Sequence, residues 1–488
     1  MNVHGSIAKT AFADARSVVE IASTGLGWTR PAIDLQVGGG PAWSAPARLG
    51  SPELGPLHAA AHALLDGTKT AVGLVEESLA VVAARDPELG AVVELLAGPA
   101  SADAAACDAE LAAGKSRGIL HGIPVTVKDV INVGGVPTRA GSDAYHDVPT
   151  QDAAGVALLK SAGAIVLAKV ATHEFALGVT NPQSSNPHDP GRIPGGSSGG
   201  SAIAVATGMG LASLGTDTRA SIRVPAALSG VVGLKPTYGR VPTDGVVTLS
   251  WTMDHVAPMA ATVADAALVA EVLLGHGGLV DACTRGVEGL TIGVAEAAFA
   301  DSEGPVGELV HEALTGLARH GARLVETPHP SPRDLARANA AGMVISRCEA
   351  TTFHTDLGLD RTLYWDEVAE QLDAADDVRA SEYINAQRIR SLLIADLGAA
   401  FAEVDLLAMP TSPVVAPPRN EFAEFLMLLA RNAIPWSLIG FPAISVPVGT
   451  VGGLPVGLQL VAEPDREDLL VAVARVVEQA AGRPALQR

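Results

Sequence analysis

Two serine-bearing turns and one lysine constrain this chain more than any other feature. The first turn reads GGSSGG and carries Ser197 and Ser198, and the second reads SIRVPA and begins at Ser221, 24 residues after Ser197. Lys128 lies 69 residues before the first turn, in the segment GIPVTVKDV. Glycine-serine runs allow a backbone to turn sharply and to bring its amides close to a ligand. The three segments together suggest a serine hydrolase that works without histidine.

Both serine turns are expected at the start of a helix. Small apolar residues at helical spacing, SAIAVATGM, follow the first turn, so Ser197 and Ser198 should lie at the mouth of a helix. The segment LASLGTDT predicts a short buried strand and SIRVPAALSG the start of another helix, which places Ser221 at a strand-to-helix turn. Unpaired amides converge at such positions.

Lys128 is the candidate base for a serine nucleophile. Its segment alternates in a β-like pattern between Gly122 and Gly134, so the side chain should point into the protein. Burial disfavours the charged ammonium and lowers the pKa of a lysine, by roughly 3 to 5 units in extreme cases. A neutral amine can accept the proton that a serine must lose during attack. The alternative is a structural ion pair with Asp129 or another carboxylate, and the two serine turns favour catalysis over it.

These segments resemble the amidase signature family. GIPVTVKDV is similar to the family's lysine strand, GGSSGG to its glycine-serine loop, and SIRVPAALSGVVGLKPTYGRVP to its nucleophile turn. The segments AMPTSPVVAPP and GFPAISVPVGTVGGLPVGLQLVAE resemble two further family blocks, so the resemblance extends over residues 58–480. It implies an α/β fold with a mixed central β-sheet that helices cover on both faces.

The resemblance also implies a Ser–cisSer–Lys site that hydrolyses linear amides, which are carbon–nitrogen bonds other than peptide bonds. Ser221 would attack the carbonyl and become acylated, and Ser197, in a cis peptide, would relay the proton to Lys128. No metal and no cofactor are expected. The oxyanion hole would be formed by the backbone amides of Thr218, Arg219, Ala220 and Ser221, and the loss of one such donor typically lowers the rate by a factor of about 100 to 1,000.

The chain departs from its relatives directly before the nucleophile. Most relatives have two glycines there, and this chain has Arg219 and Ala220. Glycine tolerates positive φ, so the arginine either has an ordinary backbone conformation or is strained. Its guanidinium can reach into the acyl pocket and pair with a carboxylate or polar group of the substrate, or turn outward and pair with an acidic residue. A distorted, inactive loop is a third possibility.

Other substrate contacts are less constrained by the sequence. We name Arg219, Ser198 and Trp436 as candidate substrate-binding residues. Aromatic residues at such spacing more often belong to a core. Asp217 is expected to brace the nucleophile loop, and Arg223 to form a structural ion pair. An amide, anilide, carbamate, urea or hydrazide all remain possible substrates.

A rival interpretation takes the glycine-serine run as a nucleophile elbow. Gly196, Ser198 and Gly200 fit the G-x-S-x-G pattern, which would make Ser198 the nucleophile and require a histidine. No histidine follows His354, whereas an elbow enzyme normally places its histidine late in the chain, although His255 and His354 stay possible. The sequence supports a phosphate-binding loop even less than an elbow, because the G-K-[ST] ending of such loops is missing. Neither rival accounts for the lysine segment.

The charge and composition of the chain exclude several classes of binding partner and site. A net charge of −20 argues against binding nucleic acid through its phosphates. Three cysteines without a C-x-x-C pair suggest neither a disulfide framework nor a zinc site. No run of 18 strongly apolar residues and no secretory signal pattern occur. We therefore expect a cytoplasmic protein, without membrane contact, that acts on a small-molecule amide as a homodimer.

The sequence predicts one catalytic domain behind an extension. Residues 1–57, rich in glycine and proline, form an N-terminal extension that packs on the body or on a partner subunit, or is a flexible tail. An amphipathic helix is predicted over 70–85. Residues 58–488 form the catalytic domain, in which 300–430 make a mainly helical cover over the substrate pocket.

Two further functions compete with a free amidase. One is the amidase-like, ammonia-releasing component of a transamidase, similar to the A subunit of an amidotransferase, which would act in a heteromeric complex on glutamine or asparagine. The other is a catalytically impaired relative that binds an amide, which would follow if Arg219 spoils the oxyanion loop.

Overall fold

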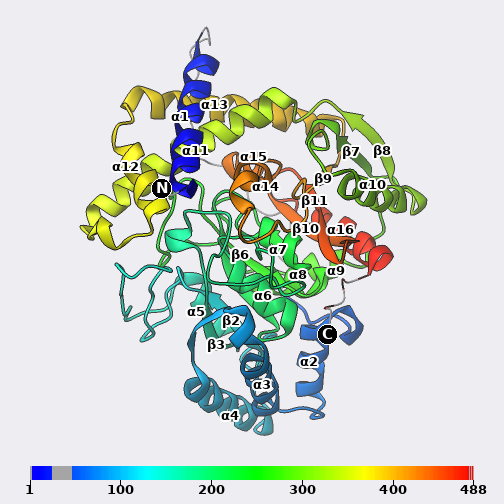
Figure 1. Cartoon of the computed structure of the whole chain (residues 1–488). Helices are drawn as coiled ribbons and strands as arrows, with labels where there is room; N and C mark the ends of the chain where they lie inside the picture. The colour runs from blue at the N-terminus through cyan, green and yellow to red at the C-terminus, as the bar shows by residue number, and fades with distance from the viewer. Residues whose placement is uncertain (1–2, 25–46, 483, 485, 487–488) are drawn as a thin grey trace.

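The core of the protein is one mixed β-sheet of 11 strands (Figure 1). The computed structural model describes residues 3–24, 47–482, 484 and 486. The strands follow the order β1-β3-β2-β4-β6-β5-β10-β11-β9-β7-β8. Strand β2 runs parallel to β3 and β4, β7 runs parallel to β8 and β9, and the remaining pairs are antiparallel. The strands are β1 (Val92–Leu95), β2 (Pro124–Lys128), β3 (Ile165–Val170), β4 (Ala212–Asp217), β5 (Val232–Lys235), β6 (His255–Ala260), β7 (Thr291–Ala295), β8 (Arg323–Thr327), β9 (Leu406–Pro410), β10 (Ala443–Val451) and β11 (Leu454–Val461).

Helices surround this sheet, as expected for the α/β class. Sixteen α-helices lie in the described part of the chain. They are α1 (Val3–Ser23), α2 (Pro56–Leu65), α3 (Ala71–Leu89), α4 (Ala97–Ala112), α5 (Ala154–Ser161), α6 (Gly199–Thr207), α7 (Arg223–Ser229), α8 (Val263–Leu274), α9 (Leu279–Ala282), α10 (Gly304–Arg319), α11 (Pro332–Leu357), α12 (Asp366–Asp376), α13 (Ala380–Ala399), α14 (Leu426–Leu429), α15 (Ile434–Leu438) and α16 (Glu467–Ala481). The predicted α/β fold with a mixed central sheet is confirmed.

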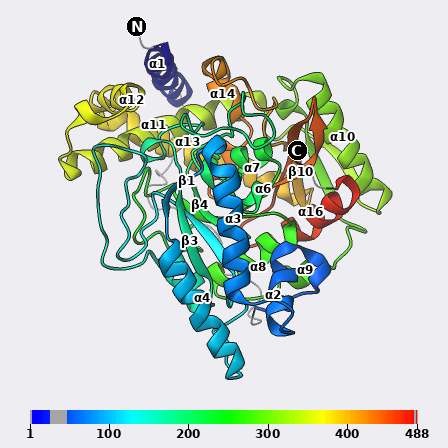
Figure 2. The same ribbon diagram turned by 60° about the horizontal axis from the view of Figure 1, so that its bottom comes forward.

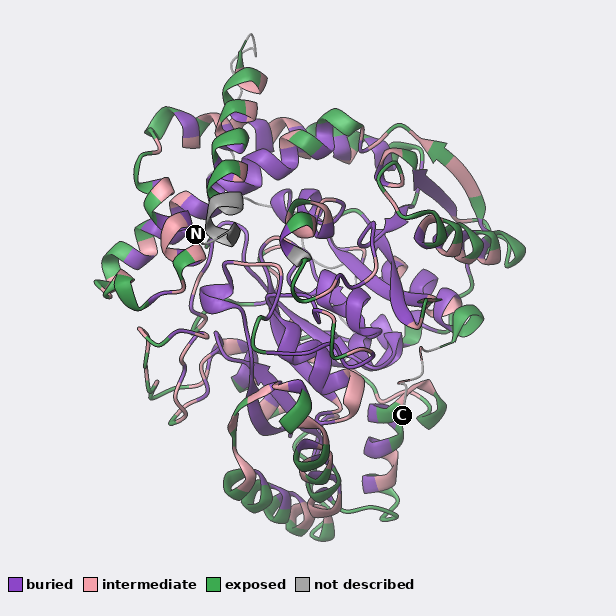
Figure 3. Ribbon diagram, viewed as in Figure 1, coloured by how far each residue is buried: buried purple, intermediate pink, exposed green. Residues whose placement is uncertain are grey.

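Strand β4 shows how both faces of the sheet are covered. Leu214 lies against Gly155 of α5, whereas the next residue, Gly215, lies against Ile222 and Ser198 at the starts of α7 and α6. Successive residues of a strand point to opposite faces, so α5 packs on one face and α6 and α7 pack on the other. Figure 3 shows that buried residues concentrate in the central strands and in α6 and α7. The serine turns therefore start from the most buried layer of the molecule.

Two helices from the N-terminal part of the chain cover one end of the sheet. Helices α3 and α4 pack together beside β2 and β3, as both views show (Figures 1 and 2). Helix α3 begins after Thr70, whose side chain accepts a hydrogen bond from Gly73 N at 3.0 Å. It corresponds to the amphipathic helix predicted over 70–85, and it exposes Glu76 and Glu77 as that pattern requires.

The N-terminal helix α1 packs on three helices from later in the chain. It contacts α11, α12 and α13, with Phe12 and Val19 buried, and Arg16 Nε lies 2.8 Å from Glu382 Oε1 of α13. Residues 25–46, which belong to the predicted N-terminal extension, lie outside the described residues. Helix α2 begins at Pro56 and continues past residue 57, the expected boundary of the extension.

The segment 300–430 supplies α10 to α14, but it is not helical throughout. Strands β8 and β9 from this segment join the central sheet beside β7. In the part of the chain that the structure describes, no helix combines the length and the apolar character needed to cross a membrane.

Candidate active site

The sheet places Lys128 beside the nucleophile turn. Strands β2 and β4 are parallel neighbours, with Val127 paired to Leu214, and they end at Lys128 and Asp217. The carboxyl ends of parallel strands meet at one edge of a sheet, where the loops that follow form a crevice. Lys128 is thus held beside the loop that leads from Asp217 to Ser221.

Lys128 is hydrogen-bonded to two hydroxyl groups and to no carboxylate. Its Nζ lies 2.7 Å from Ser197 Oγ and 2.8 Å from Thr216 Oγ1. The peptide bond between Gly196 and Ser197 is cis. The alternative partner, Asp129, instead forms an ion pair with Lys169, at 2.9 Å. The structural ion pair considered for Lys128 is therefore absent from the described residues, and the lysine points at the first serine turn.

Burial also changes the acidity of this lysine. Lys128 has no exposed surface. Desolvation lowers its pKa from 10.5 to about 7, even though the nearby carboxylates of Asp254 and Asp217 act in the opposite direction. A large fraction of the amine is therefore uncharged near neutral pH, and an uncharged amine can accept a proton.

The backbone joins the second serine turn to the first. Ser198 N donates to Ser221 O at 3.3 Å, so the two turns lie side by side. The Ser221 hydroxyl makes no hydrogen bond to any described residue, and Ser221 keeps 5% of its surface exposed. The structure therefore links two of the three predicted catalytic side chains by a hydrogen bond, and it holds the third beside them through the backbone.

Asp217 braces the nucleophile loop, as the sequence predicted. Its Oδ1 accepts from Ala220 N at 2.9 Å and its Oδ2 accepts from Ile222 N at 3.3 Å. One of the four expected oxyanion donors, the Ala220 amide, is therefore engaged by a side chain in this structure. The amides of Thr218, Arg219 and Ser221 donate to no described group.

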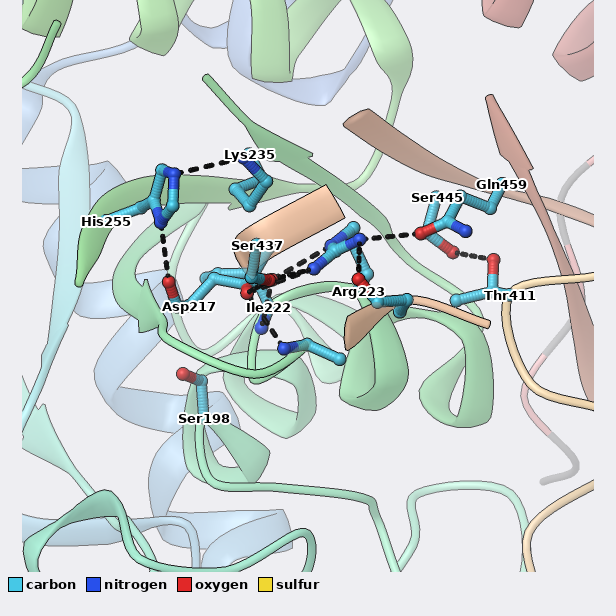
Figure 4. Close-up of polar contacts among 12 residues, drawn as sticks. Ser198, Asp217, Ile222, Arg223, Lys235, His255, Thr411, Ser437, Ser445 and Gln459 are labelled. Atoms are coloured by element: carbon cyan, nitrogen blue, oxygen red, sulfur yellow. Dashed lines mark hydrogen bonds and ion pairs between the residues drawn. The ribbon is translucent and has the colours of Figure 1, made fainter. Parts of the chain in front are cut away.

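Arg223 and Asp217 form the ion pair at the centre of a buried network (Figure 4). Arg223 Nε donates to Asp217 Oδ2 at 3.0 Å, and Nη1 donates to Gln459 Oε1 at 2.7 Å. Ser437 Oγ lies 2.8 Å from Asp217 Oδ1. Burial alone would raise the pKa of Asp217, but the Arg223 guanidinium outweighs it and holds that pKa well below its ordinary value. The predicted structural role of both residues is confirmed.

The elbow interpretation finds no support in the surroundings of Ser198. Ser198 Oγ donates to Thr216 O at 3.1 Å. His255 instead bonds to Lys235 Nζ and Asp217 O, and Figure 4 shows it apart from Ser198. His354 bonds to the Tyr364 hydroxyl at 2.9 Å. Within the described residues, no histidine is hydrogen-bonded to Ser198.

Arg219 faces a pocket next to the serine turns. The pocket has a cavity volume of about 70 Å³ and is partly open to solvent. Arg219 makes no ion pair with any described acidic residue, so the outward pairing considered from the sequence is not what the structure shows. Its backbone φ is not positive, whereas Ala220 has a φ of 87°. The left-handed conformation that glycine normally adopts thus falls on Ala220 and not on the arginine.

The other two candidate substrate-binding residues, Trp436 and Ser198, do not line this pocket. Trp436 has no exposed surface and packs in the core with Ile439 and Phe401, outside the pocket that Arg219 lines. Ser198 is equally buried, and its hydroxyl is taken up by the backbone of Thr216. A single sequence cannot tell a buried tryptophan in a motif segment from one that lines a pocket, because both environments are apolar.

Several residues of the site were not anticipated. Thr216 supplies the second hydroxyl group that is hydrogen-bonded to Lys128. It lies two residues after Leu214, which pairs with Val127, so its position in the strand LASLGTDT could have indicated this contact. Ser437 and Gln459 complete the network around Arg223. Arg347 lines the same pocket as Arg219 from a distant helix. No sequence pattern marks these last three residues.

Comparison with known proteins fits this geometry. The profile of the family described as Amidase matches residues 73–471. The chain belongs to the amidase signature family. It is an amidase-family hydrolase of carbon–nitrogen bonds, and the resemblance inferred from the motif segments is confirmed.

Individual relatives include different activities. The A subunit of the glutamyl-tRNA(Gln) amidotransferase of Chloroflexus aggregans is 37% identical over 477 residues, which cover 88% of this chain and 98% of that protein. A crystal structure described as an amidase superposes with a TM-score of 0.80 at 35% identity, covering 87% of this chain and 100% of the other. The peptide amidase from Stenotrophomonas maltophilia superposes with a TM-score of 0.73 at 29% identity, covering 88% and 97%.

Proposed function

We propose that the protein hydrolyses a linear carboxamide or a related acyl–nitrogen bond through an acyl-enzyme on Ser221. The observation that carries this proposal is the buried Lys128, whose pKa of about 7 leaves it partly neutral and whose Nζ lies 2.7 Å from Ser197 Oγ. A neutral amine within hydrogen-bond reach of a hydroxyl meets both requirements for a general base, the geometry and the pKa.

The proton path follows from these contacts. Ser221 Oγ attacks the amide carbon and gives its proton to Ser197 Oγ, while Ser197 passes its own proton to Lys128 Nζ. The same path, reversed, delivers a proton to the leaving nitrogen as the carbon–nitrogen bond breaks. Water then attacks the acyl-enzyme, releases the carboxylic acid and restores the Ser221 hydroxyl. Catalytic hydrogen bonds often tighten only when substrate binds, so the Ser221 hydroxyl would join Ser197 at that stage.

The oxyanion donors in this scheme are the amides of the nucleophile loop. The amides of Thr218, Arg219 and Ser221 donate to none of the described groups, so they are available to the negative charge that develops on the carbonyl oxygen. Ala220 N already donates to Asp217 Oδ1. We therefore assign the Ala220 amide to supporting the loop. It would bind the oxyanion only if its hydrogen bond to Asp217 lengthens.

A fluorophosphonate probe with peptide mass mapping tests the proposal. Ser221 should be labelled in the wild-type protein, and labelling should fall by orders of magnitude in Lys128→Ala because the base is removed. The Lys69→Ala variant is a matched control, since Lys69 is an exposed lysine paired with Glu77. Labelling of Ser198 in place of Ser221 would overturn the assignment. A folded protein that labels at neither serine would indicate the impaired, amide-binding relative.

A second function is favoured by the relatives. Several similar proteins are amidotransferase A subunits at 35 to 38% identity, so the chain is also a candidate for an ammonia-releasing component of a complex. Such a component would show glutaminase or asparaginase activity that rises when its partner subunits are added. A free amidase, for which we propose a cytoplasmic homodimer, would be fully active alone, and light scattering after size-exclusion chromatography would give its mass.

A further inference from the structure

Two arginines from distant parts of the chain meet in the pocket beside the serine turns. Arg219 comes from the loop before Ser221, and Arg347 comes from α11, more than a hundred residues later. Arg347 keeps 6% of its surface exposed. The charge of Arg219 lies close enough to lower the pKa of Arg347. Two guanidinium groups therefore share one buried space.

Neither guanidinium has a carboxylate partner among the described residues. Arg219 makes no hydrogen bond there, and its Nε is buried without a partner. Arg347 donates only to neutral groups, to Ser346 Oγ at 3.2 Å and to Gln371 Oε1 at 2.5 Å. Arg223, buried a few residues from Arg219, has its full ion pair with Asp217. Buried charges are normally paired, and here two guanidinium groups line one pocket without a carboxylate partner, so the pocket is suited to an anionic ligand.

The remaining charges of the pocket do not neutralise them. Of the pocket-lining residues that the structure describes, Glu367 is the one carboxylate, and it accepts a hydrogen bond from His173 Nε2 at 2.8 Å. Burial lowers the pKa of both arginines, that of Arg219 to about 10. A guanidinium nevertheless stays protonated in proteins at neutral pH, so the end of the pocket that the two arginines form is positive.

The pocket adjoins the reacting groups on both serine turns. Arg219 stands two residues before Ser221. Thr180, which also lines the pocket, has its backbone packed against Gly196, the residue before Ser197. A small molecule whose carbonyl reaches Ser221 would thus place its far end toward the two arginines.

We propose that this pocket binds a carboxylate of the substrate, held by Arg219 and Arg347 together. The protein then acts on amides that carry a carboxylate, an inference that rests on the proposed amidase function. A guanidinium binds a carboxylate with two parallel hydrogen bonds. Gln371 is a positioning residue, because its Nε2 donates to the carbonyl groups of Leu177 and Glu367 and so turns Oε1 toward Arg347.

Direct binding tests the inference without relying on catalysis. We would titrate unbranched dicarboxylates of about three to six carbons, and their neutral diamides, into the wild-type protein by calorimetry. The best dicarboxylate should bind at least about 30-fold more tightly than its diamide, and Arg219→Met and Arg347→Met should each lose about 30-fold of that affinity. Arg431→Met is the matched control, because Arg431 lines a neighbouring cavity and is paired with Asp301. That variant should bind as the wild type does.

Stability measurements separate a binding role from a structural one. An arginine buried without a carboxylate partner should not stabilise the fold, so Arg347→Met should unfold at the same or a higher denaturant concentration than the wild type while it loses dicarboxylate affinity. A large loss of stability would indicate a structural arginine and would overturn the inference. Equal affinities for dicarboxylates and diamides, or unchanged affinity in both arginine variants, would overturn it as well.

Kinetics then locate the carboxylate within the substrate. Half-amides of dicarboxylic acids carry it on the acyl side, and N-acyl amino acids carry it on the amine side. The wild type should hydrolyse one of the two series with a higher kcat/KM than neutral amides. In the Arg347→Met variant this difference in kcat/KM should disappear. Labelling of Ser221 by the fluorophosphonate probe, measured in parallel, distinguishes the two proposals. A labelled protein with no preference for carboxylates refutes only the pocket assignment, and an unlabelled one refutes the amidase.

Discussion

Arg223 and Asp217 form an ion pair with no exposed surface on either side chain, 3.0 Å between Nε and Oδ2, directly beneath the loop that carries Ser221. The same carboxylate binds the amides of Ala220 and Ile222. Asp217 therefore couples the position of the nucleophile to the packing of α7. The arginine, through Gln459 and Ser437, ties the loop to the strands and helices of the C-terminal part.

Removing the arginine of this pair should destabilise the protein. Arg223→Met leaves the Asp217 carboxylate buried and unpaired, which should cost about 3 to 5 kcal/mol in the free energy of unfolding at neutral pH. The pKa of Asp217 is depressed in the folded state, so its contribution is present above about pH 4 and is lost as the pH falls further. Urea unfolding at pH 7 and at low pH measures both effects.

A surface arginine gives the control for this loss. Arg361 pairs with Asp373 and Asp376, whose side chains are 65% and 49% exposed. Arg361→Met should therefore change the free energy of unfolding by at most about 1 kcal/mol. Equal losses in the two variants would mean that the buried pair has no special part in holding the loop.

The activity should rise with pH through the titration of Lys128. Its pKa of about 7 means that the amine is mostly charged at pH 6 and mostly neutral at pH 8. Only the neutral form accepts a proton, so kcat/KM should increase about tenfold per pH unit below pH 7 and level off above it. A profile that is flat from pH 5 to 8 would contradict the assignment of Lys128 as the base. Lys128→Arg should be inactive throughout, because a guanidinium stays charged.

The parts of the site that lie next to one another in sequence could be predicted, because local patterns fix them. The strand ending at Lys128, the glycine-serine loop and the strand-turn-helix around Ser221 each carry their own periodicity, and parallel pairing of β2 and β4 brings them together. The structure accordingly places Lys128 Nζ 2.7 Å from Ser197 Oγ across 69 residues.

The substrate pocket could not be predicted in the same way. Arg347 and Gln371 reach it from α11 and α12, whose packing depends on tertiary contacts that leave no motif in the sequence. Trp436 illustrates the opposite error, since it lies within a motif segment and yet serves the core. The side to which Arg219 points likewise depends on groups far along the chain.

The loop before the nucleophile should become more stable when Ala220 is replaced by glycine. Ala220 has a φ of 87°, a conformation that costs a residue with a Cβ about 1 to 3 kcal/mol. Ala220→Gly relieves this strain, partly offset by the larger entropy of the unfolded chain, so we expect a gain of about 1 kcal/mol in the free energy of unfolding. Ala226→Gly in the middle of α7 is the control and should lose about 1 kcal/mol or more. A loss in both variants would show that the loop is unstrained.

The hydrogen bond between Thr216 and Lys128 should affect the pH at which the enzyme becomes active. Thr216 Oγ1 accepts a hydrogen bond from Lys128 Nζ at 2.8 Å, and this bond favours the charged ammonium. Thr216→Val removes the acceptor, so the Lys128 pKa should fall and the rising limb of kcat/KM should move to lower pH. Thr216→Ser keeps the hydroxyl and should restore the wild-type profile. Thr216 would serve packing alone if Thr216→Val lost activity without a shift in the pH profile and if Thr216→Ser did not restore that activity. Only a change in the hydrogen bonding of the ammonium shifts the rising part of the profile.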